Sequence, residues 1–514
     1  MKYFLTLIQL WVGFLSICAS YPKANIWIIP SVESPQVYRN YAQTSKVHLE
    51  MARGEVEHIQ LVFPSKVNEE YRFTFDRYLK GIQISARELK KMNGYYDALV
   101  PFKNQLKCTD TLTAVWITVQ CPSRVPVGKY HQTIKIEGSK HFTIQLDYNV
   151  HHTTIPLKSS IPITVGVENR CMTECLNDKE ADKERQRWVD FVLSYRMTPV
   201  FGTQITPERW QYEHSFSPWA WNDKRSIRLL NDRRYSCYML PFFTLSENEL
   251  ASLLCNIQKK GKLKESLFYI WDEPAYMEDY EQIKRKVNII RKYASDARIL
   301  TTFFCGPRNG PRKGDLYAVF DYLKHHIHVA TISLAPCKGN EGEVQHIRYK
   351  VPEGIDWWSY VCWQPGGNEP NFLLQMKGIQ QRAIMWRTWK NGSQGFLYWN
   401  CNIYHKRNPF TYITDMPHGD GILIYPGDIL GCKGPIASAR LERWRDGAEE
   451  MELLRLVEKN YSKEKADTLL NIVYSSPLSF IEKAHNIPFF RKELLDQLDK
   501  TIPIDYKLRI TDFI

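Results

Sequence analysis

The strongest constraint on the fold is an alternation of short apolar runs with helical segments over residues 158–430. Each run is rich in β-branched and aromatic residues and is short enough to be one buried strand. Several runs are separated by amphipathic helices, one of which begins with the capping box Ser246-x-x-Glu249. Eight runs can be counted, which is the strand number of a (β/α)8 TIM-like barrel. The runs are IPITVGV, TPVFGTQ, YSCYMLPFF, SLFYIWDEP, ARILTTFF, HVATISLAP, DWWSYVCW and GFLYWNC.

The segments on either side of this predicted barrel have different patterns. Residues 21–157 contain short alternating runs such as HIQLVF, AVWITVQ and FTIQLDYNV between turn residues, which predicts an antiparallel β-sandwich. Residues 431–514 begin with a long helical pattern, ARLERWRDGAEEMELLRLVEKN. We therefore predict a multidomain protein with an N-terminal sandwich, a central barrel and a helical C-terminal region.

Residues 1–20 have the organisation of a signal peptide. Lys2 supplies the positive charge, residues 3–17 form an apolar run, and Cys18-Ala19-Ser20 ends in the small residues that a signal peptidase requires. We expect cleavage near Ser20 and a secreted or periplasmic protein. A lipoprotein anchor on Cys18 is the alternative, disfavoured by the large Ile17 before it. No later segment is long and apolar enough to span a bilayer.

The charge pattern and the cysteine count narrow the classes of binding partner and cofactor. The formal net charge is +12, but basic and acidic residues are interleaved as on solvated helix faces, and no basic stretch with aromatics indicates nucleic-acid binding. Of 12 cysteines, Cys18 leaves with the signal, so the odd remainder is not a complete disulfide framework. Cys171 and Cys175 could bridge or bind a metal, the metal being disfavoured because no second pair of ligands is nearby. We expect no metal and no organic cofactor.

The candidate catalytic residues are Asp272 and Glu273, within LFYIWDEP. Pro274 has no amide hydrogen to donate to a neighbouring strand and so ends the strand, which places both acids at its C-terminal end, where barrel active sites are built. Neighbouring acids do not readily bracket a sugar ring, whereas a general acid beside an acid that orients an N-acetyl nucleophile fits the spacing. Mutual repulsion separates their pKa values. On local sequence alone, Asp-Glu-Pro is equally typical of a helix cap.

The chain resembles glycoside hydrolase family 123 and relatives that share its C-terminal region. The resemblance rests on MARGEVEHIQLVF in the first domain, on YIWDEP, and above all on HGDGILIYPGDILGCKGPIASARLERWRDGAEEMELL. It implies a sandwich joined to a barrel, and retaining, substrate-assisted hydrolysis of terminal β-N-acetylgalactosamine. It also implies that Asp272 stabilises the acetamido group and that Glu273 is the acid/base.

Aromatic residues after the last two barrel strands are candidates for substrate binding. Trp363, Tyr398 and Trp399 lie nearest the C-terminal ends, and Tyr360 precedes them. The alternative is that these side chains pack in the barrel core. Some aromatic residues of these strands, including Trp357 and Trp358, must do so, because alternate residues of a strand face the helices.

Two further groups are assigned no part in the chemistry. Residues Arg440, Glu442, Arg443, Arg445 and Asp446 have helical spacing and are expected to form a structural ion network. His325, His326 and His328 precede a strand and so belong to the far face of the barrel.

The leading hypothesis is a retaining exo-glycosidase acting on a terminal β-linked N-acetylhexosamine, with a glycan or glycoconjugate as its partner. A glycosidase of the same fold with another sugar, and a glycan-binding protein without turnover, are the alternatives. Retention of both acids argues against the binding protein.

Overall fold

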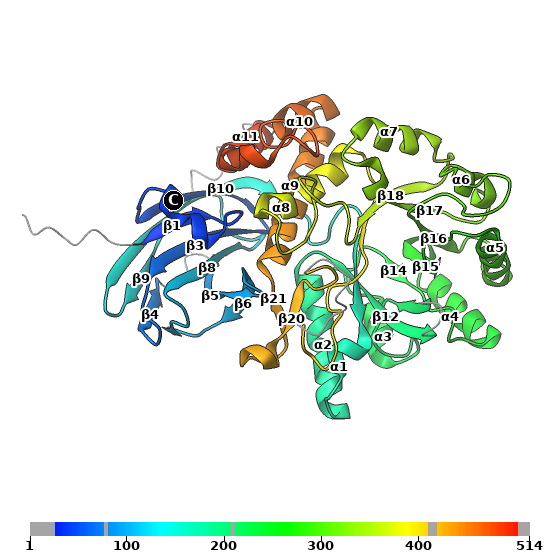
Figure 1. The fold of residues 1–514 in the computed structure, drawn as a ribbon, viewed down its shortest axis with the longest axis horizontal. Coiled ribbons are helices and arrows are strands. Elements are labelled where there is room, and N and C mark those ends of the chain that lie inside the picture. Colours follow the sequence, from blue (N-terminus) through cyan, green and yellow to red (C-terminus); the bar gives the residue numbers. More distant parts are fainter. Residues whose placement is uncertain (1–25, 77–80, 207–210, 410–418, 502–514) are drawn as a thin grey trace, which may run out of the picture.

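The computed structural model describes residues 26–76, 81–206, 211–409 and 419–501. The predicted signal peptide lies outside these residues. The β-sandwich and a barrel-like sheet form the two ends of the molecule, and the helices from the C-terminal part of the chain lie at their junction (Figure 1). No helix in the described ranges is long and apolar enough to cross a membrane.

The N-terminal domain consists of two five-stranded sheets. Alternation places Tyr71 and Phe73 on the buried face of one strand, where they share a core with Leu61 and Ile117 of the other sheet. Neighbouring strands are antiparallel as predicted, except that β2 and β10 run parallel. The first sheet has the order β1 (Trp27–Pro30), β3 (Glu55–Pro64), β8 (Leu112–Cys121), β5 (Gln83–Met92) and β6 (Tyr95–Pro101). The second has β2 (Lys46–Arg53), β10 (His141–Thr154), β9 (Gly128–Glu137), β4 (Glu70–Phe75) and β7 (Gln105–Lys107).

The second sheet system is a nearly closed, nine-stranded barrel. Each of the eight predicted runs corresponds to one strand, and adjacent members of this set pair in parallel, except that β12 and β14 do not pair with each other. The strands are β11 (Ile163–Glu168), β12 (Thr198–Thr206), β14 (Tyr238–Met239), β15 (Ser266–Trp271), β16 (Arg298–Phe303), β17 (Val329–Ser333), β18 (Asp356–Val361) and β19 (Phe396–Tyr398).

The ninth strand departs from the prediction. Strand β13 (Gln211–Ser215) is antiparallel to β12 and occupies the gap between β12 and β14. The amide of Phe216, just after β13, donates to the Met239 carbonyl at 2.6 Å, which links the two edges of the sheet. Its sequence, QYEHS, is polar and lacks the apolar character by which the other strands are recognised.

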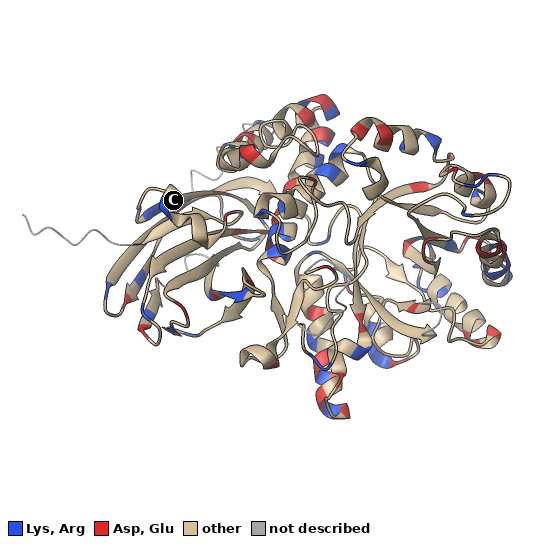
Figure 2. Ribbon diagram, in the orientation of Figure 1, with Lys and Arg blue, Asp and Glu red and all other residues tan. Residues whose placement is uncertain are grey.

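Helices follow most of the parallel strands and cover the outside of the barrel (Figure 1). The predicted capping box is confirmed, since Ser246 Oγ accepts from the Glu249 amide and the Glu249 carboxylate accepts from the Ser246 amide. Charged residues of both signs are interspersed on these helices, as Figure 2 shows. The helices are α1 (Asn169–Thr173), α2 (Asp178–Ser194), α3 (Lys224–Leu229), α4 (Glu247–Lys259), α5 (Met277–Arg291), α6 (Ala318–Leu323), α7 (Glu341–Lys350) and α8 (Gly378–Lys390).

After β19 the chain forms a small hairpin and three helices at the junction with the sandwich. Ser438 caps α9 by accepting from the Leu441 amide at 3.1 Å, and an isolated bridge joins Ser438 to Ala98 of the sandwich. The hairpin strands are β20 (Ile424–Pro426) and β21 (Pro435–Ala437), and the helices are α9 (Ala439–Asn460), α10 (Lys463–Leu470) and α11 (Ile487–Asp499).

The charged residues of α9 form the structural ion network that their spacing predicted. Arg440 pairs with Asp97 of the sandwich at 2.9 Å, and Arg382 of α8 pairs with Asp446 at 3.1 Å. Glu442 contacts Arg87 of the sandwich at 2.6 Å. Since these α9 residues are buried, removing one partner would leave an uncompensated charge in the interior. The network therefore joins the sandwich to the barrel.

The described cysteines are all unpaired, including buried Cys171 and exposed Cys175. Within the described part of the chain, no group of three His, Cys, Asp or Glu side chains is arranged to hold a metal ion.

Candidate active site

Strand β15 ends at Trp271 and delivers Asp272 and Glu273 to the C-terminal mouth of the barrel. Because β14 to β19 run in the same direction, the ends of these strands gather at one rim. Below the rim, the interior is filled by apolar side chains from several strands, among them Met239, Leu267, Leu300 and Trp358. The barrel interior beneath the two acids is therefore filled with side chains and is not an open channel.

Two hydroxyl groups hold Asp272. Tyr269 Oη donates to Asp272 Oδ1 at 2.7 Å, and Thr302 Oγ1 of the adjacent strand β16 donates to the same oxygen at 2.6 Å. The Thr302 hydroxyl also accepts from the Glu273 amide at 3.0 Å. The Asp272 carboxylate is thus fixed in position through one oxygen.

Glu273 points to a different part of the rim. The hydroxyl of Tyr360, on β18, donates a hydrogen bond to Glu273 Oε1. Burial holds the pKa of the Tyr360 phenol far above its usual value, so this hydroxyl keeps its proton and remains a donor at neutral pH. The carboxyl groups of Asp272 and Glu273 are accordingly held by side chains of different strands.

Backbone geometry explains how adjacent residues diverge in this way. The pairing of β15 with β16 shifts register between Tyr269 and Trp271, which marks a bulge. Glu273 has a φ of 45°, in the left-handed region that residues with a side chain rarely adopt. Such strain costs free energy and is typical of functional sites. A simple helix cap requires neither feature.

The surroundings of Glu273 favour its protonated form. Loss of hydration raises the pKa of its carboxyl to about 7, with a further contribution from the charge of Asp272. The Tyr360 hydrogen bond and the charge of Arg308 act in the opposite direction. Although the residue as a whole is exposed at the rim, its carboxyl accepts from the buried Tyr360 hydroxyl, and loss of hydration is the largest cause of the raised pKa.

The predicted aromatic residues occupy three kinds of position. Trp363 is 41% exposed beyond β18, whereas Tyr360 is buried and contacts Glu273. Tyr398 is fully buried, and its ring packs against Phe372 and Trp444. Trp399 is half-buried. Of these four rings, that of Trp363 is the most exposed.

Tyr398 and Trp399 converge on a carboxyl that sequence reasoning missed. Tyr398 Oη donates to Asp420 Oδ1 at 3.1 Å, and Trp399 Nε1 donates to the same oxygen at 3.0 Å. Burial raises the pKa of Asp420 to about 6, and its second oxygen contacts no donor among the described residues. Asp420 belongs to the HGDG segment, so that motif was available as a signal.

His214 is a second residue that the sequence did not indicate. Its ring stacks on Tyr269 with centroids 4.2 Å apart and an angle of 10° between the planes. Burial lowers the pKa of His214 to about 3, so the imidazole is neutral. It packs against the phenol that holds Asp272, and it comes from β13, the strand that the pattern of apolar runs does not reveal.

The discounted histidines lie at the other end of the barrel. His325, His326 and His328 fall between α6 and β17, before the N-terminal end of that strand. The His328 ring accepts a hydrogen bond from the Ile299 amide at 3.2 Å.

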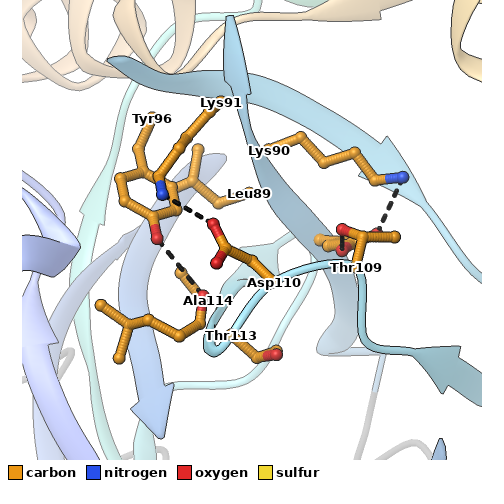
Figure 3. Close-up of a pocket in the computed structure, with 10 residues that line it drawn as sticks. Leu89, Lys90, Lys91, Tyr96, Thr109, Asp110, Thr113 and Ala114 are labelled. Carbon is orange, nitrogen blue, oxygen red and sulfur yellow. Dashed lines mark hydrogen bonds and ion pairs between the residues drawn. The ribbon is translucent and has the colours of Figure 1, made fainter. Parts of the chain in front are cut away.

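A hollow of about 210 Å³ lies on the sandwich, remote in sequence from the two acids (Figure 3). Its charged groups already neutralise one another, because Lys91 pairs with Asp110 at 2.6 Å and Lys90 with Glu88 at 3.3 Å. It offers no unpaired acid or nucleophile comparable with those at the barrel mouth.

A barrel with a supported carboxyl pair at the C-terminal ends of its strands is the arrangement of a glycoside hydrolase. The profile of the family "Glycoside hydrolase 123, catalytic domain" matches residues 183–457. The chain belongs to glycoside hydrolase family 123.

A solved structure from the same family agrees in fold. The chain is similar to a family 123 glycoside hydrolase from Clostridium perfringens, described in terms of glycolipid glycan hydrolysis, with 14% identity and a TM-score of 0.62. The alignment covers 95% of this chain and 100% of that one. A family 2 β-galacturonidase from Eisenbergiella tayi aligns over 77% of this chain and 69% of its own at 9% identity, with a TM-score of 0.32 that is too low to indicate a shared fold. No curated protein matches the sequence.

Proposed function

We propose that this glycoside hydrolase is a retaining exo-enzyme that releases a terminal β-linked N-acetylhexosamine by substrate-assisted catalysis. The sugar that we propose first is N-acetylgalactosamine. The observation that carries the proposal is the unequal environment of two adjacent acids. Glu273 has a pKa of about 7, suited to a proton donor, and Asp272 is held in position by two hydroxyl groups.

In the first step Glu273 gives its proton to the glycosidic oxygen, and the bond from that oxygen to C1 breaks. The carbonyl oxygen of the 2-acetamido group attacks C1 from the opposite face and forms a cyclic oxazolinium ion. The Asp272 carboxylate accepts the acetamido N–H and stabilises the positive charge that develops there.

In the second step the Glu273 carboxylate removes a proton from water, which attacks C1. The C1 bond to the acetamido oxygen breaks, the acetamide is restored, and Glu273 is again protonated. Two inversions at C1 give net retention. Every proton and bond is accounted for without a metal or an organic cofactor.

The eight parallel strands with their intervening helices support a (β/α)8 barrel into which β13 is inserted. The exposed ring of Trp363 supports its proposed role as a ring that stacks on the sugar. In this arrangement Tyr398 and Trp399 act through the Asp420 carboxyl.

A panel of chromogenic α- and β-glycosides tests the proposal. We expect hydrolysis of the β-N-acetylgalactosaminide with the β-anomer as the first product observed by NMR. The matched β-galactoside, with a hydroxyl at C2, should react poorly because it lacks the internal nucleophile. Equal cleavage of the two would point to a nucleophile carried by the enzyme, and sugar binding by calorimetry without hydrolysis would indicate a binding protein.

The pH profile provides a second expected result. Because burial raises the pKa of Glu273 to about 7, the acid is protonated below that pH and loses its proton above it. On the alkaline side kcat/KM should therefore fall, by about tenfold per pH unit. Measurements on a substrate with a poor leaving group should show this limb, and the Glu273→Gln variant should lack it. An unchanged alkaline limb in that variant would assign the titration to another group.

We also propose that the protein is exported, from the pattern of residues 1–20. Mass spectrometry of the protein from its natural host should find an N-terminus near Tyr21. An intact Met1 or a lipid on Cys18 would contradict this.

A further inference from the structure

The loop that follows β16 is fixed against the catalytic turn after β15. The Arg308 amide donates to the Ala275 carbonyl at 2.6 Å. The side chain of the next residue, Asn309, accepts from the Met277 amide at 2.8 Å and donates to Glu278 at 3.2 Å. These bonds hold the Arg308 backbone against residues 275–278, which directly follow Glu273.

The Arg308 side chain is an unneutralised cation at the rim. It is exposed, and among the described residues no carboxylate lies within ion-pair distance of its guanidinium. Its partners are neutral: the guanidinium carbon lies 5.9 Å from the centre of the Tyr276 ring, and interactions with Tyr276 and Cys305 raise its pKa. Arg312, four residues further along the same loop, instead pairs with Asp315 and Asp321.

The ring beside Arg308 is also open to solvent. Tyr276 is 45% exposed, although a large aromatic side chain has apolar area to bury. An exposed ring with a guanidinium against it can stack on a sugar face and bind an anionic substituent of that sugar at the same time. Glu278, two residues after Tyr276, is engaged by Asn309.

The position of this pair relative to Glu273 defines which part of the substrate it meets. A general acid must touch the glycosidic oxygen, and the sugar on the far side of that oxygen is the leaving group. Tyr276 and Arg308 lie on the segments directly after Glu273, and the Arg308 charge acts on the Glu273 carboxyl. This proximity to the general acid favours the sugar on the leaving-group side, rather than the terminal N-acetylhexosamine, as the sugar that they contact.

We propose that Tyr276 and Arg308 form the binding site for the leaving sugar, and that this sugar carries an anionic group, a carboxylate or a sulfate ester. The planar guanidinium binds either anion through two parallel hydrogen bonds. This inference rests on the proposed function, because it assumes that Glu273 protonates the leaving oxygen.

Matched disaccharides test the proposal. The first has N-acetylgalactosamine β-linked to a hexuronic acid, the second is its carboxyl-reduced counterpart, and the third carries a sulfate ester on the reduced sugar. We expect kcat/KM for at least one anionic substrate to exceed that for the neutral one by roughly five- to tenfold at low ionic strength, and the ratio to shrink as salt is added. The carboxylate and sulfate arms show which anion is recognised.

Variants assign the preference to one side chain. Arg308→Gln should bring the ratio of anionic to neutral kcat/KM to about one, and Arg308→Lys should restore part of it through charge alone. Lys313→Gln is the matched control, since it removes one positive charge from the same exposed loop and should leave the ratio unchanged.

Three outcomes overturn the inference. They are equal rates on charged and neutral disaccharides, a ratio that survives in Arg308→Gln, and an equal loss of the ratio in Lys313→Gln, which would indicate diffuse loop charge. Each leaves the proposed function standing, because the neutral disaccharide is still cleaved. If none of the disaccharides and no N-acetylhexosaminide is cleaved, the proposed function itself fails.

Discussion

Replacing Asp272 by asparagine should lower kcat by about 10²- to 10³-fold on every N-acetylhexosaminide, whatever its leaving group. Asparagine keeps the shape of the side chain and an oxygen that can accept from Tyr269 and Thr302. It lacks the negative charge that stabilises the oxazolinium ion, and that ion is formed in the first step and consumed in the second whatever group departs. The effect should therefore be uniform across substrates.

The measurement is a set of kcat values for aryl N-acetylgalactosaminides whose phenols differ in acidity. Asp356→Asn is the matched control, because Asp356 lies at the start of β18, at the opposite end of the barrel, and pairs with Arg298. The control should retain its kcat. Near-normal rates for Asp272→Asn on all substrates would exclude Asp272 from the chemistry, and near-normal rates for Glu273→Gln as well would assign both acids to a structural turn.

The strands of the barrel could be predicted from sequence because each is a run of buried apolar residues. Val329–Ser333, for example, is buried along its whole length, and such a run has few alternatives to a central strand. Gln211–Ser215 could not be predicted, because its residues are polar and the strand is held by the edges of β12 and β14. Its place depends on tertiary contacts alone.

The site shows the same division between local and long-range information. Asp272 and Glu273 were predictable because a strand and the proline after it are adjacent in sequence. Their supports were not, since Thr302 and Tyr360 come from other strands. Tyr398 was predicted to meet substrate from its place at a strand end, but sequence does not reveal that its hydroxyl is occupied by Asp420 from a later loop.

The second large effect is expected from Glu273→Gln, and its size should depend on the substrate. Glutamine cannot donate the proton that a poor leaving group requires, so disaccharides and alkyl glycosides should lose about 10²- to 10⁴-fold in kcat/KM. A dinitrophenolate departs without protonation, and its glycoside should lose much less in the first step. Glutamine can still accept from Tyr360, so the strained turn at Glu273 has a partner in the variant.

The slope of log kcat/KM against the pKa of the leaving phenol is the decisive measurement. It should steepen in Glu273→Gln and stay as in the wild type, at lower absolute rates, in Asp272→Asn. That contrast separates a proton donor from a charge stabiliser, although the two residues are neighbours in sequence. Two variants with the same slope would mean that the acids act as one unit. A steeper slope in Asp272→Asn would exchange their roles, with the proton held by the carboxyl that Tyr269 and Thr302 now bind.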